Sequence, residues 1–294
     1  MNKNYSNETM KLLYERASCR AFQNKEIPEN VLNEIINAGL HAATGGNLQP
    51  YAIIKIVEDE TKKRLVNDCD MQNLVANAPV NLLFCIDWRR IGRWAKACNA
   101  PFVATKSYRH FWIALQDTVI CAQNICTAAD AVGLGSVYIG TVESCFKELK
   151  SIFNLPEGVF PVVLVSLGYP IEYPAPANKL GIQAIVHEET YKDLDIDTLK
   201  ELHDEKYNYK KFPLNQSNLS QIHEVASDIG GKKYADELLN NIETTGYINM
   251  AQRYFGLHYK ANWSCVGNKD FVDTLLAYGF TWIKGEDFPV KNKE

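Results

Sequence analysis

The sequence has few of the features that mark metal, disulfide or membrane proteins. Its eight cysteines are scattered without a Cys-x-x-Cys pair, and its six histidines show no metal-ligand spacing. We therefore expect no disulfide framework, zinc site or iron–sulfur site, and free thiols fit a reducing cytoplasm. The N-terminus lacks the apolar segment of a signal peptide, and the apolar runs 80–86 and 162–167 are too short to span a bilayer.

An excess of positive charge is also missing. The chain of 294 residues has 31 Lys and Arg against 35 Asp and Glu, a formal net charge of −4. This balance argues against a general nucleic-acid or membrane-surface binder, although it is compatible with a small cationic pocket. With 46% hydrophobic and 22% charged residues, the chain can bury a sizeable core in one large domain or two small ones.

Common catalytic and nucleotide-binding motifs are absent. The run 230–233, Gly-Gly-Lys-Lys, lacks the first glycine and the upstream strand of a phosphate loop, so a polar turn is favoured. Gly133, Gly135 and Gly140 do not have dinucleotide-site spacing, and no Gly-x-Ser-x-Gly elbow is present. With no evident acid, nucleophile or metal ligand set, the sequence favours chemistry carried by a cofactor.

Hydrophobic periodicity predicts alternating helices and strands up to about residue 190. A helix is expected over 28–40, and another over 105–132 that is apolar around most of its circumference and hence central and buried. This alternation favours a three-layer α/β or α+β domain. The rest reads as helical and polar, with a loop at 212–220 and a break at 230–231. The expected strands are 52–57, 80–85, 136–140 and 161–167.

Two segments in the first fifty residues are candidates for ligand binding. Arg16, Ser18 and Arg20 alternate, so an extended segment would aim all three side chains to one side and form an anion site. On spacing alone a solvated basic turn is favoured. In the turn 42–51, paired glycines allow close backbone approach, and Thr44 and Asn47 offer polar groups, but an ordinary turn is equally credible.

Two later segments complete the set of candidates. The stretch 133–141 reads as a strand ending at Gly140 before a new helix, which leaves free backbone N–H groups; simple punctuation between two elements is the alternative. Lys179 follows in a proline-rich loop, where it would meet a phosphate or be merely solvated.

Together, in this order and at these separations, these segments resemble the FMN-dependent nitroreductase family over residues 8–195. The resemblance is nearest to its oxygen-insensitive NADPH nitroreductase and NADPH–flavin oxidoreductase group. It implies an α+β fold, an α/β/α sandwich with a mixed central sheet flanked by helices. It further implies an FMN-binding core at 1–195 and a helical extension at 196–294 that wraps the partner subunit and shapes the cleft. The matching segments are 16–22, 43–49, Gln72, 122–124, 133–140, 167–170 and 186–188.

The resemblance also implies an activity and an assembly. It implies a cytoplasmic homodimer with FMN at the subunit interface and NADPH or NADH as electron donor. Hydride would pass through flavin N5, in a ping-pong reaction, to a nitroaromatic, quinone or flavin acceptor, with no dedicated catalytic side chain. No nucleic-acid or membrane partner is expected. The alternatives are a flavin reductase serving a partner monooxygenase, a reductive dehalogenase, and a non-catalytic flavin-binding or storage protein.

By position, the resemblance assigns roles to individual residues. Arg20 would lie near the N1/C2 edge of the flavin, Thr44 would come from the partner chain, and Lys179 would meet the phosphate. In the family's Lys-Pro-Arg phosphate clamp, Ala177 and Asn178 replace the lysine and the proline. The expected FMN-binding residues are Arg16, Ala17, Ser18, Arg20, Thr44, Asn47, Gln72, Tyr138, Ile139, Gly140, Thr141 and Lys179.

The loop that reads the 2′-phosphate of NADPH in the group is not recognisable. Lys210 and Lys211 are the candidates to substitute for it, and a solvated charge pair is the favoured interpretation.

Overall fold

The chain folds into two compact units in a computed structural model that describes residues 4–285. Unit 1 contains residues 4–176 and 269–285, and unit 2 contains residues 177–268. The boundary expected near residue 195 thus falls within unit 2, and the last described segment packs with unit 1. No described helix is both long enough and apolar enough to cross a membrane, and no described cluster of side chains could hold a metal ion.

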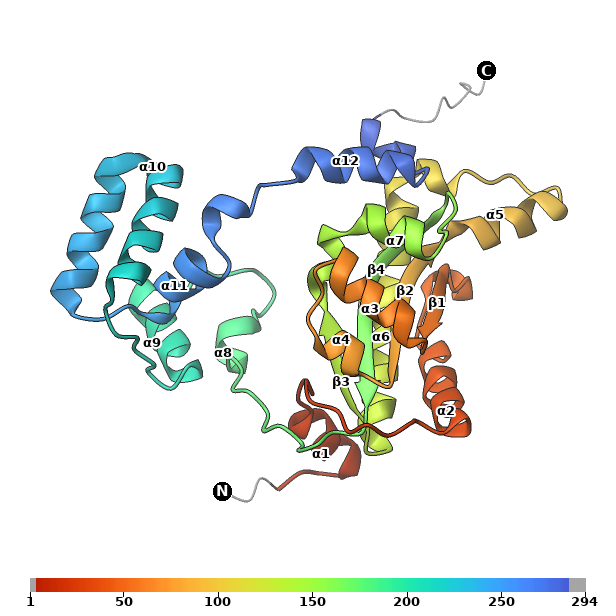
Figure 1. Ribbon diagram of the computed structural model, residues 1–294, viewed down its shortest axis with the longest axis horizontal. Coiled ribbons are helices and arrows are strands. Elements are labelled where there is room, and N and C mark those ends of the chain that lie inside the picture. The colour runs from red at the N-terminus through yellow and green to blue at the C-terminus, as the bar shows by residue number, and fades with distance from the viewer. Residues whose placement is uncertain (1–3, 286–294) are drawn as a thin grey trace. The chain divides into compact units, whose positions relative to one another are not determined.

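Unit 1 is built on a four-stranded sheet (Figure 1). Neighbouring strands pair antiparallel. Among the described residues, the parallel part of the mixed sheet is one bridge between Ser18 and Ser136. All four strands were predicted from the sequence, within two residues at either end. In spatial order they are β1 (Tyr51–Ile56), β2 (Val80–Asp87), β4 (Val159–Gly168) and β3 (Gly135–Ile139).

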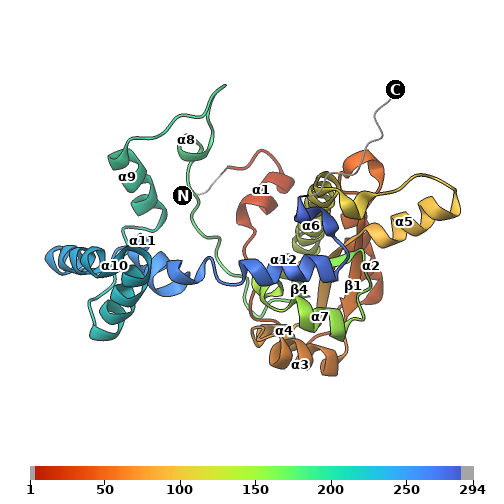
Figure 2. The same cartoon turned by 90° about the horizontal axis from the view of Figure 1, so that it is seen from above.

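The two central strands are apolar because helices cover both of their faces. In β2, Leu82 and Phe84 face one hydrophobic cluster, whereas Leu83 and Cys85 face the other. Helices α2 and α6 cover the first face, and α3, α4 and α7 cover the second (Figures 1 and 2). This arrangement confirms the three-layer α+β fold. The helices are α2 (Glu29–Leu40), α6 (Tyr108–Ala131), α3 (Asp59–Asp68), α4 (Leu74–Asn77) and α7 (Phe146–Ile152).

Helix α6 is not buried all round, as its composition had suggested. One side packs on the sheet and on α2, where a Cβ atom at Gly39 would lie only 2.3 Å from Cγ1 of Ile125. The opposite side carries Trp112, Val119 and Ile120, which are exposed in the single chain. The helix is therefore apolar on two sides, of which unit 1 covers one.

The C-terminal segment completes the core of unit 1. It contains α12 (Asn268–Ala277) and a 3₁₀ turn over Thr281–Lys284. Phe280 is fully buried, with its ring 5.3 Å from that of Phe111, and the Tyr278 ring lies 5.1 Å from that of Phe160. The remaining helices of unit 1 are α1 (Glu8–Glu15) and α5 (Trp88–Ala97).

Unit 2 is helical. Its core contains Ile222, Ile242 and Ile248. The predicted break is confirmed at Gly231, where φ is 79° and α10 kinks. The predicted loop at 212–220 is wrong after Asn215, because the Asn215 side chain accepts the Asn218 N–H at 2.8 Å and caps α10. The helices are α8 (Ile182–Ile185), α9 (Ile196–Lys206), α10 (Gln216–Thr245) and α11 (Met250–Arg253), followed by a π-helical turn over Tyr254–His258.

Candidate functional site

The segment after α1 runs along the exposed edge of β3. The Cys19 N–H donates to the Ser136 carbonyl at 2.9 Å, and Ser18 pairs with Ser136. Ala17 and Cys19 are buried, whereas Arg16 and Ser18 are partly exposed. The predicted alternation of side chains is therefore confirmed, because the backbone is extended and held against a strand.

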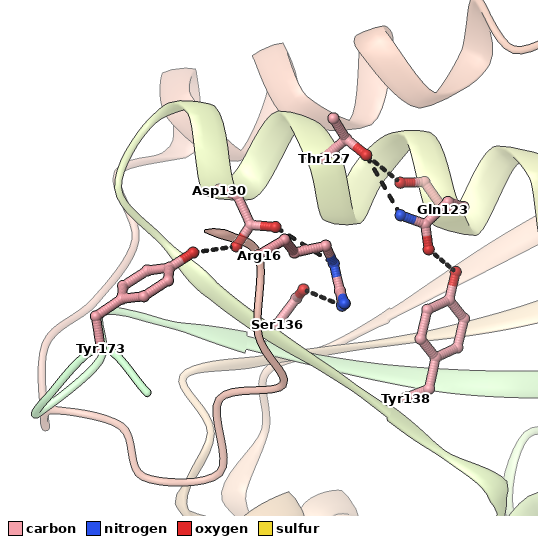
Figure 3. A network of polar contacts seen from close by, with 7 residues as sticks. All are labelled: Arg16, Gln123, Thr127, Asp130, Ser136, Tyr138 and Tyr173. Atoms are coloured by element: carbon pink, nitrogen blue, oxygen red, sulfur yellow. Dashed lines mark hydrogen bonds and ion pairs between the residues drawn. The ribbon is translucent and has the colours of Figure 1, made fainter. Parts of the chain in front are cut away.

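Arg16 lies in a network of polar contacts (Figure 3). Its Nε atom is 3.4 Å from Oδ2 of Asp130, and its Nη2 donates to Ser136 Oγ at 3.4 Å. The Tyr173 hydroxyl donates to Oδ1 of the same carboxylate. The side chains of Arg16 and Asp130 are only 19% and 2% exposed, so both sides of the ion pair are held within the protein.

The surroundings of the Asp130 carboxylate make its charged form unfavourable. Burial raises its pKa, while the bond from Tyr173 and the charge of Arg16 act in the opposite direction. Arg16 Nε and Asp130 Oδ2 are both buried and make no well-directed hydrogen bond. The pair therefore fixes the position of the guanidinium group without saturating its donors.

Arg20 has a different environment from Arg16. Its side chain is exposed, and its contact among the described residues is a long bond of 3.5 Å from Nη1 to the Ser18 carbonyl. Its charge is therefore available to an anion.

The end of β3 carries partly buried side chains and is followed by Gly140, which has no side chain to fill the space beside it. Tyr138 is half-buried, and its hydroxyl donates to Gln123 Oε1 at 3.4 Å (Figure 3). Burial raises the pKa of that hydroxyl. Ile139 packs in the core, and the 3₁₀ turn over Gly140–Ser144 follows, with Thr141 half-buried in it. A Cβ atom at Gly140 would meet nothing within 4 Å, so a ligand has room there.

The turn 44–47 is fixed by a buried acid on α6. The Gly45 N–H points at both oxygens of Asp117, at 3.1 Å each. Gly46 and Asn47 have left-handed φ values of 61° and 56°. Thr44 Oγ1 is buried and has no hydrogen-bond partner among the described residues. A buried hydroxyl without a partner is unusual and indicates a site that something else completes.

The comparison with known proteins decides the family. The profile described as the Nitroreductase family matches residues 13–169, more than half of the chain. The chain belongs to the nitroreductase family. The match covers the segment along β3, the turn 44–47 and the end of β3.

Individual nitroreductase relatives agree over long stretches. An FMN reductase (NAD(P)H) of Bacillus subtilis is 30% identical over 86% of this chain and 93% of its own length. An oxygen-insensitive NADPH nitroreductase of Salmonella typhimurium is 29% identical over 64% of this chain and 76% of its own. The structure of an NADPH:FMN oxidoreductase from Vibrio harveyi complexed with NAD⁺ is 28% identical, with a TM-score of 0.64, covering 82% of this chain and 98% of that one.

The structure brings some of the expected site residues of this nitroreductase together and leaves others apart. Arg16 and Ser18 lie beside β3, whereas the turn 44–47 lies against α6, and no hydrogen bond or ion pair within residues 4–285 links the two. Gln72 is exposed between α3 and α4. Lys179 is exposed in the segment of unit 2 that precedes α8.

Sequence reasoning missed three residues that organise these segments. Asp117 holds the turn 44–47, and Asp130 with Tyr173 holds Arg16. A signal was available for the two acids, because they are the only carboxylates in α6, a helix that the sequence predicts to be buried. Tyr173 gave no such signal, since it lies between Pro170 and Pro174 in an irregular segment.

Proposed function

We propose that this chain is an FMN-dependent NAD(P)H oxidoreductase that passes electrons to nitroaromatic, quinone or flavin acceptors. The names of its relatives support the reaction class. The observation that carries the proposal is the segment 16–20, which is hydrogen-bonded to β3 inside the matched region. It presents two arginines, of which Arg16 is held by an ion pair and, in the described part of the chain, Arg20 makes only a long bond to its own segment.

The available groups fit FMN. A flavin mononucleotide needs cations for its phosphate and for the N1/C2 edge of its ring, and polar donors for the ribityl chain. Within residues 4–285, Arg20 makes one long bond, Arg16 keeps unused donors, and the buried Thr44 Oγ1 has no hydrogen-bond partner. Gly140 leaves space for a ligand. This donor set suits a large planar anion better than it suits a metal ion or an acyl substrate.

Each residue then has a defined task. Arg20 would place its positive charge beside the flavin edge and favour the negative charge gained on reduction. Arg16, held by Asp130, binds FMN from a preset position. Bound FMN supplies the hydride acceptance and delivery that no side chain here provides. The other proposed FMN contacts are Ala17, Ser18, Thr44, Asn47, Gln72, Tyr138, Ile139, Gly140, Thr141 and Lys179.

We also infer that the protein is a homodimer with FMN at its interface. The exposed apolar side of α6 supports this, because Trp112 is 60%, Val119 40% and Ile120 44% exposed on that side of the helix. A second copy packed on this face would bring its own turn 44–47, so that Thr44 of one chain contacts the FMN of the other. The eight thiols without a disulfide further support a cytoplasmic location.

One preparation tests the proposal. The purified protein should be yellow and should release about one FMN per chain on denaturation. Anaerobic addition of NADPH or NADH should bleach the bound flavin, and a nitroaromatic or quinone should restore its colour. A colourless protein that takes up no FMN contradicts the proposal, and bound flavin that neither donor bleaches supports a storage protein instead.

A further inference from the structure

Positive charge is concentrated in one part of unit 1. The stretch 88–116 contains six Lys or Arg and no Asp or Glu, in a chain whose net charge is −4. It includes α5, which extends outward from the rest of unit 1 (Figures 1 and 2). The inner side of α5 packs on the core through Trp88 and Ile91, so its charged side faces away from the core.

Three of these cations form a stripe on the outer side of α5. Arg89, Arg93 and Lys96 are spaced i, i+4 and i+7, so they lie on one face of the helix, and all three residues are exposed. Among the described residues, none of the three has a carboxylate within ion-pair distance, whereas the neighbouring Arg90 pairs with Asp87 at 3.4 Å. The stripe thus presents positive charge that no acid in the described chain balances.

Negative charge is concentrated in unit 2. The stretch 188–205 contains eight Asp or Glu and two Lys. On α9, Asp197, Glu201 and Asp204 have the same i, i+4, i+7 spacing as the cations of α5, and all three are exposed. Glu201 accepts a hydrogen bond from the Tyr209 hydroxyl, but within residues 4–285 none of the three acids has an ion-pair partner. Helix α9 therefore carries an acidic stripe that matches the cationic one in spacing.

Helix α9 gains little from burial within a single chain. None of its 11 residues is buried, and Ile196 is 63% and Leu199 40% exposed. Isolated helices shorter than about 12–15 residues are marginal in water, and most helical stability in proteins comes from packing. We therefore expect another surface to cover α9, and the acidic stripe favours a cationic surface.

Helix α5 adjoins the face of α6 on which a second copy is proposed to pack. The Trp88 indole N–H donates to the His110 carbonyl, in the first turn of α6, at 3.2 Å. Trp112, part of the proposed dimer face, lies two residues further along the same helix. A second chain seated on the outer side of α6 would thus lie next to α5.

We propose that, in the homodimer, α5 of one chain docks on α9 of the other through these two stripes of opposite charge. Because the two-fold axis of a dimer repeats every contact, both stripes of both chains are used. Each exposed ion pair contributes little alone, so the stripes determine which surfaces meet more than how tightly they bind. The inference rests on the proposed homodimer and gives unit 2 a task in assembly.

Two charge-reversal variants test this pairing. The first changes α5, with Arg89→Glu and Arg93→Glu, and the second changes α9, with Asp197→Lys and Asp204→Lys. In a dimer of either variant with itself, like charges face each other and repel. In a dimer that contains one chain of each, both contacts regain opposite charges.

Co-expression of the two variants with different tags measures the preference. If reversal weakens each homodimer about tenfold relative to the mixed dimer, native mass spectrometry should find about nine tenths mixed dimer, against about one half for random association. The excess should fall as salt is raised, since exposed charges are screened.

A matched control separates the stripes from net charge. Lys63→Glu with Lys147→Glu makes the same change in net charge as the α5 variant, at exposed positions on α3 and α7. Co-expressed with the α9 variant, it should give about one half mixed dimer, because its own α5 is unchanged. A share of mixed dimer for the α5 variant equal to that of the control overturns the pairing, which is also the result expected if some other surface covers α9.

The outcomes separate this inference from the proposed function. A wild-type chain that is monomeric contradicts the proposed homodimer and the helix pairing with it, whereas a wild-type dimer without an excess of mixed dimer contradicts the pairing alone. Flavin content and bleaching by NAD(P)H should be the same in all variants, since none of the changed residues is assigned to FMN. An excess of mixed dimer in a protein that contains no flavin supports the pairing and contradicts the proposed oxidoreductase.

Discussion

Arg16 and Arg20 lie in one short segment, but their guanidinium groups contribute in different ways. Arg16 is held by a buried carboxylate, so part of its charge is already balanced. In the part of the chain that the structure describes, Arg20 has one long contact to its own segment, so its charge is available. The loss of Arg20 should therefore affect an anionic ligand most directly.

Replacing Arg20 should weaken FMN binding. A charge-assisted hydrogen bond contributes about 1.5–3 kcal/mol, so Arg20→Ala should raise the dissociation constant of FMN by about 10- to 150-fold. Fluorescence titration of the flavin-free protein measures this. Arg93→Ala, an exposed arginine on α5, is the matched control and should leave FMN affinity unchanged. Equal affinities of the two variants would contradict the role of Arg20.

The Asp130 carboxyl should make stability depend on pH. Burial raises its pKa in the folded state above the unfolded value. Such a group stabilises the fold fully below its unfolded pKa and loses this contribution as the pH rises through the folded pKa. The free energy of unfolding, wild type minus Asp130→Asn, should thus decrease from about pH 4 upward. Urea titrations at several pH values measure it, and a difference independent of pH would disprove the assignment.

At the residue scale, local pattern could be predicted and long-range partners could not. The alternation of Arg16, Ser18 and Arg20 follows from the geometry of any extended segment. That Asp130 and Tyr173 close on Arg16 depends on how α6 and the segment after β4 pack, which spacing does not reveal. The orphaned hydroxyl of Thr44 likewise appears only once its neighbours are in place.

Helix α6 shows at the element scale why composition alone misleads. Its apolar residues occupy two sides, so a single chain cannot cover them all. The inner side is set by the sheet and α2. The outer side, with Trp112, Val119 and Ile120, is accounted for by the proposed second copy.

A charge on the outer side of α6 should weaken self-association. Burying an isoleucine side chain contributes about 1.5–3 kcal/mol, so Ile120→Lys should raise the dimer dissociation constant at least about tenfold. Light scattering coupled to size-exclusion chromatography measures the mass. Val57→Lys is the matched control, because Val57 is 43% exposed against 44% for Ile120 and lies after β1. A dimer that persists in Ile120→Lys as in the control would exclude this face as the interface.

The crossing of α2 and α6 should not tolerate a larger residue at Gly39. A Cβ atom there would lie 2.3 Å from Cγ1 of Ile125 and 3.3 Å from the Cys121 carbonyl oxygen. Gly39→Ala should therefore lower the free energy of unfolding by about 1–3 kcal/mol. Chemical denaturation measures this, with the exposed Asn37→Ala on the same helix expected to stay within about 0.5 kcal/mol. A stable Gly39→Ala protein would mean that the helices can separate at little cost.

Helices and strands with a clear hydrophobic period were predictable. Helix ends that depend on a capping side chain, and the order in which strands pair, were not. The strands and the helices α2 and α6 follow from hydrophobic spacing. The start of α10 depends on the Asn215 cap inside a polar stretch that reads as a loop. The strand order β1-β2-β4-β3 arises from contacts between segments that are distant in sequence. Hydrophobic periodicity contains no information on such contacts.

At the scale of the whole molecule, unit 1 is discontinuous in sequence. The chain leaves it after residue 176 and re-enters it at residue 269. The sequence boundary near residue 195 followed the end of the strand signals. The return of the chain to unit 1 could not be predicted. Tyr278 and Phe280 have the same sequence pattern as other aromatic residues in helical regions.

Removing the ring of Phe280 should destabilise unit 1 as strongly as a change in its centre. A fully buried phenylalanine costs about 3–5 kcal/mol on truncation, so Phe280→Ala should lower the free energy of unfolding by that amount. Phe271→Ala is the control in the same segment and should cost less, since Phe271 is 40% exposed. Equal losses in the two variants would show that Phe280 is not part of the core.

The discontinuity of unit 1 has a consequence for how the protein is made. Phe160 leaves the ribosome well before Phe280, and the 120 positions that separate them take about 6–24 s to synthesise at about 5–20 residues per second. During that time the site that Phe280 fills stays open, with Phe111 and Phe160 lacking part of their cover. The nascent chain must therefore keep an unfinished core soluble while unit 2 is translated, and a ribosome that stalls within unit 2 releases a chain prone to aggregation.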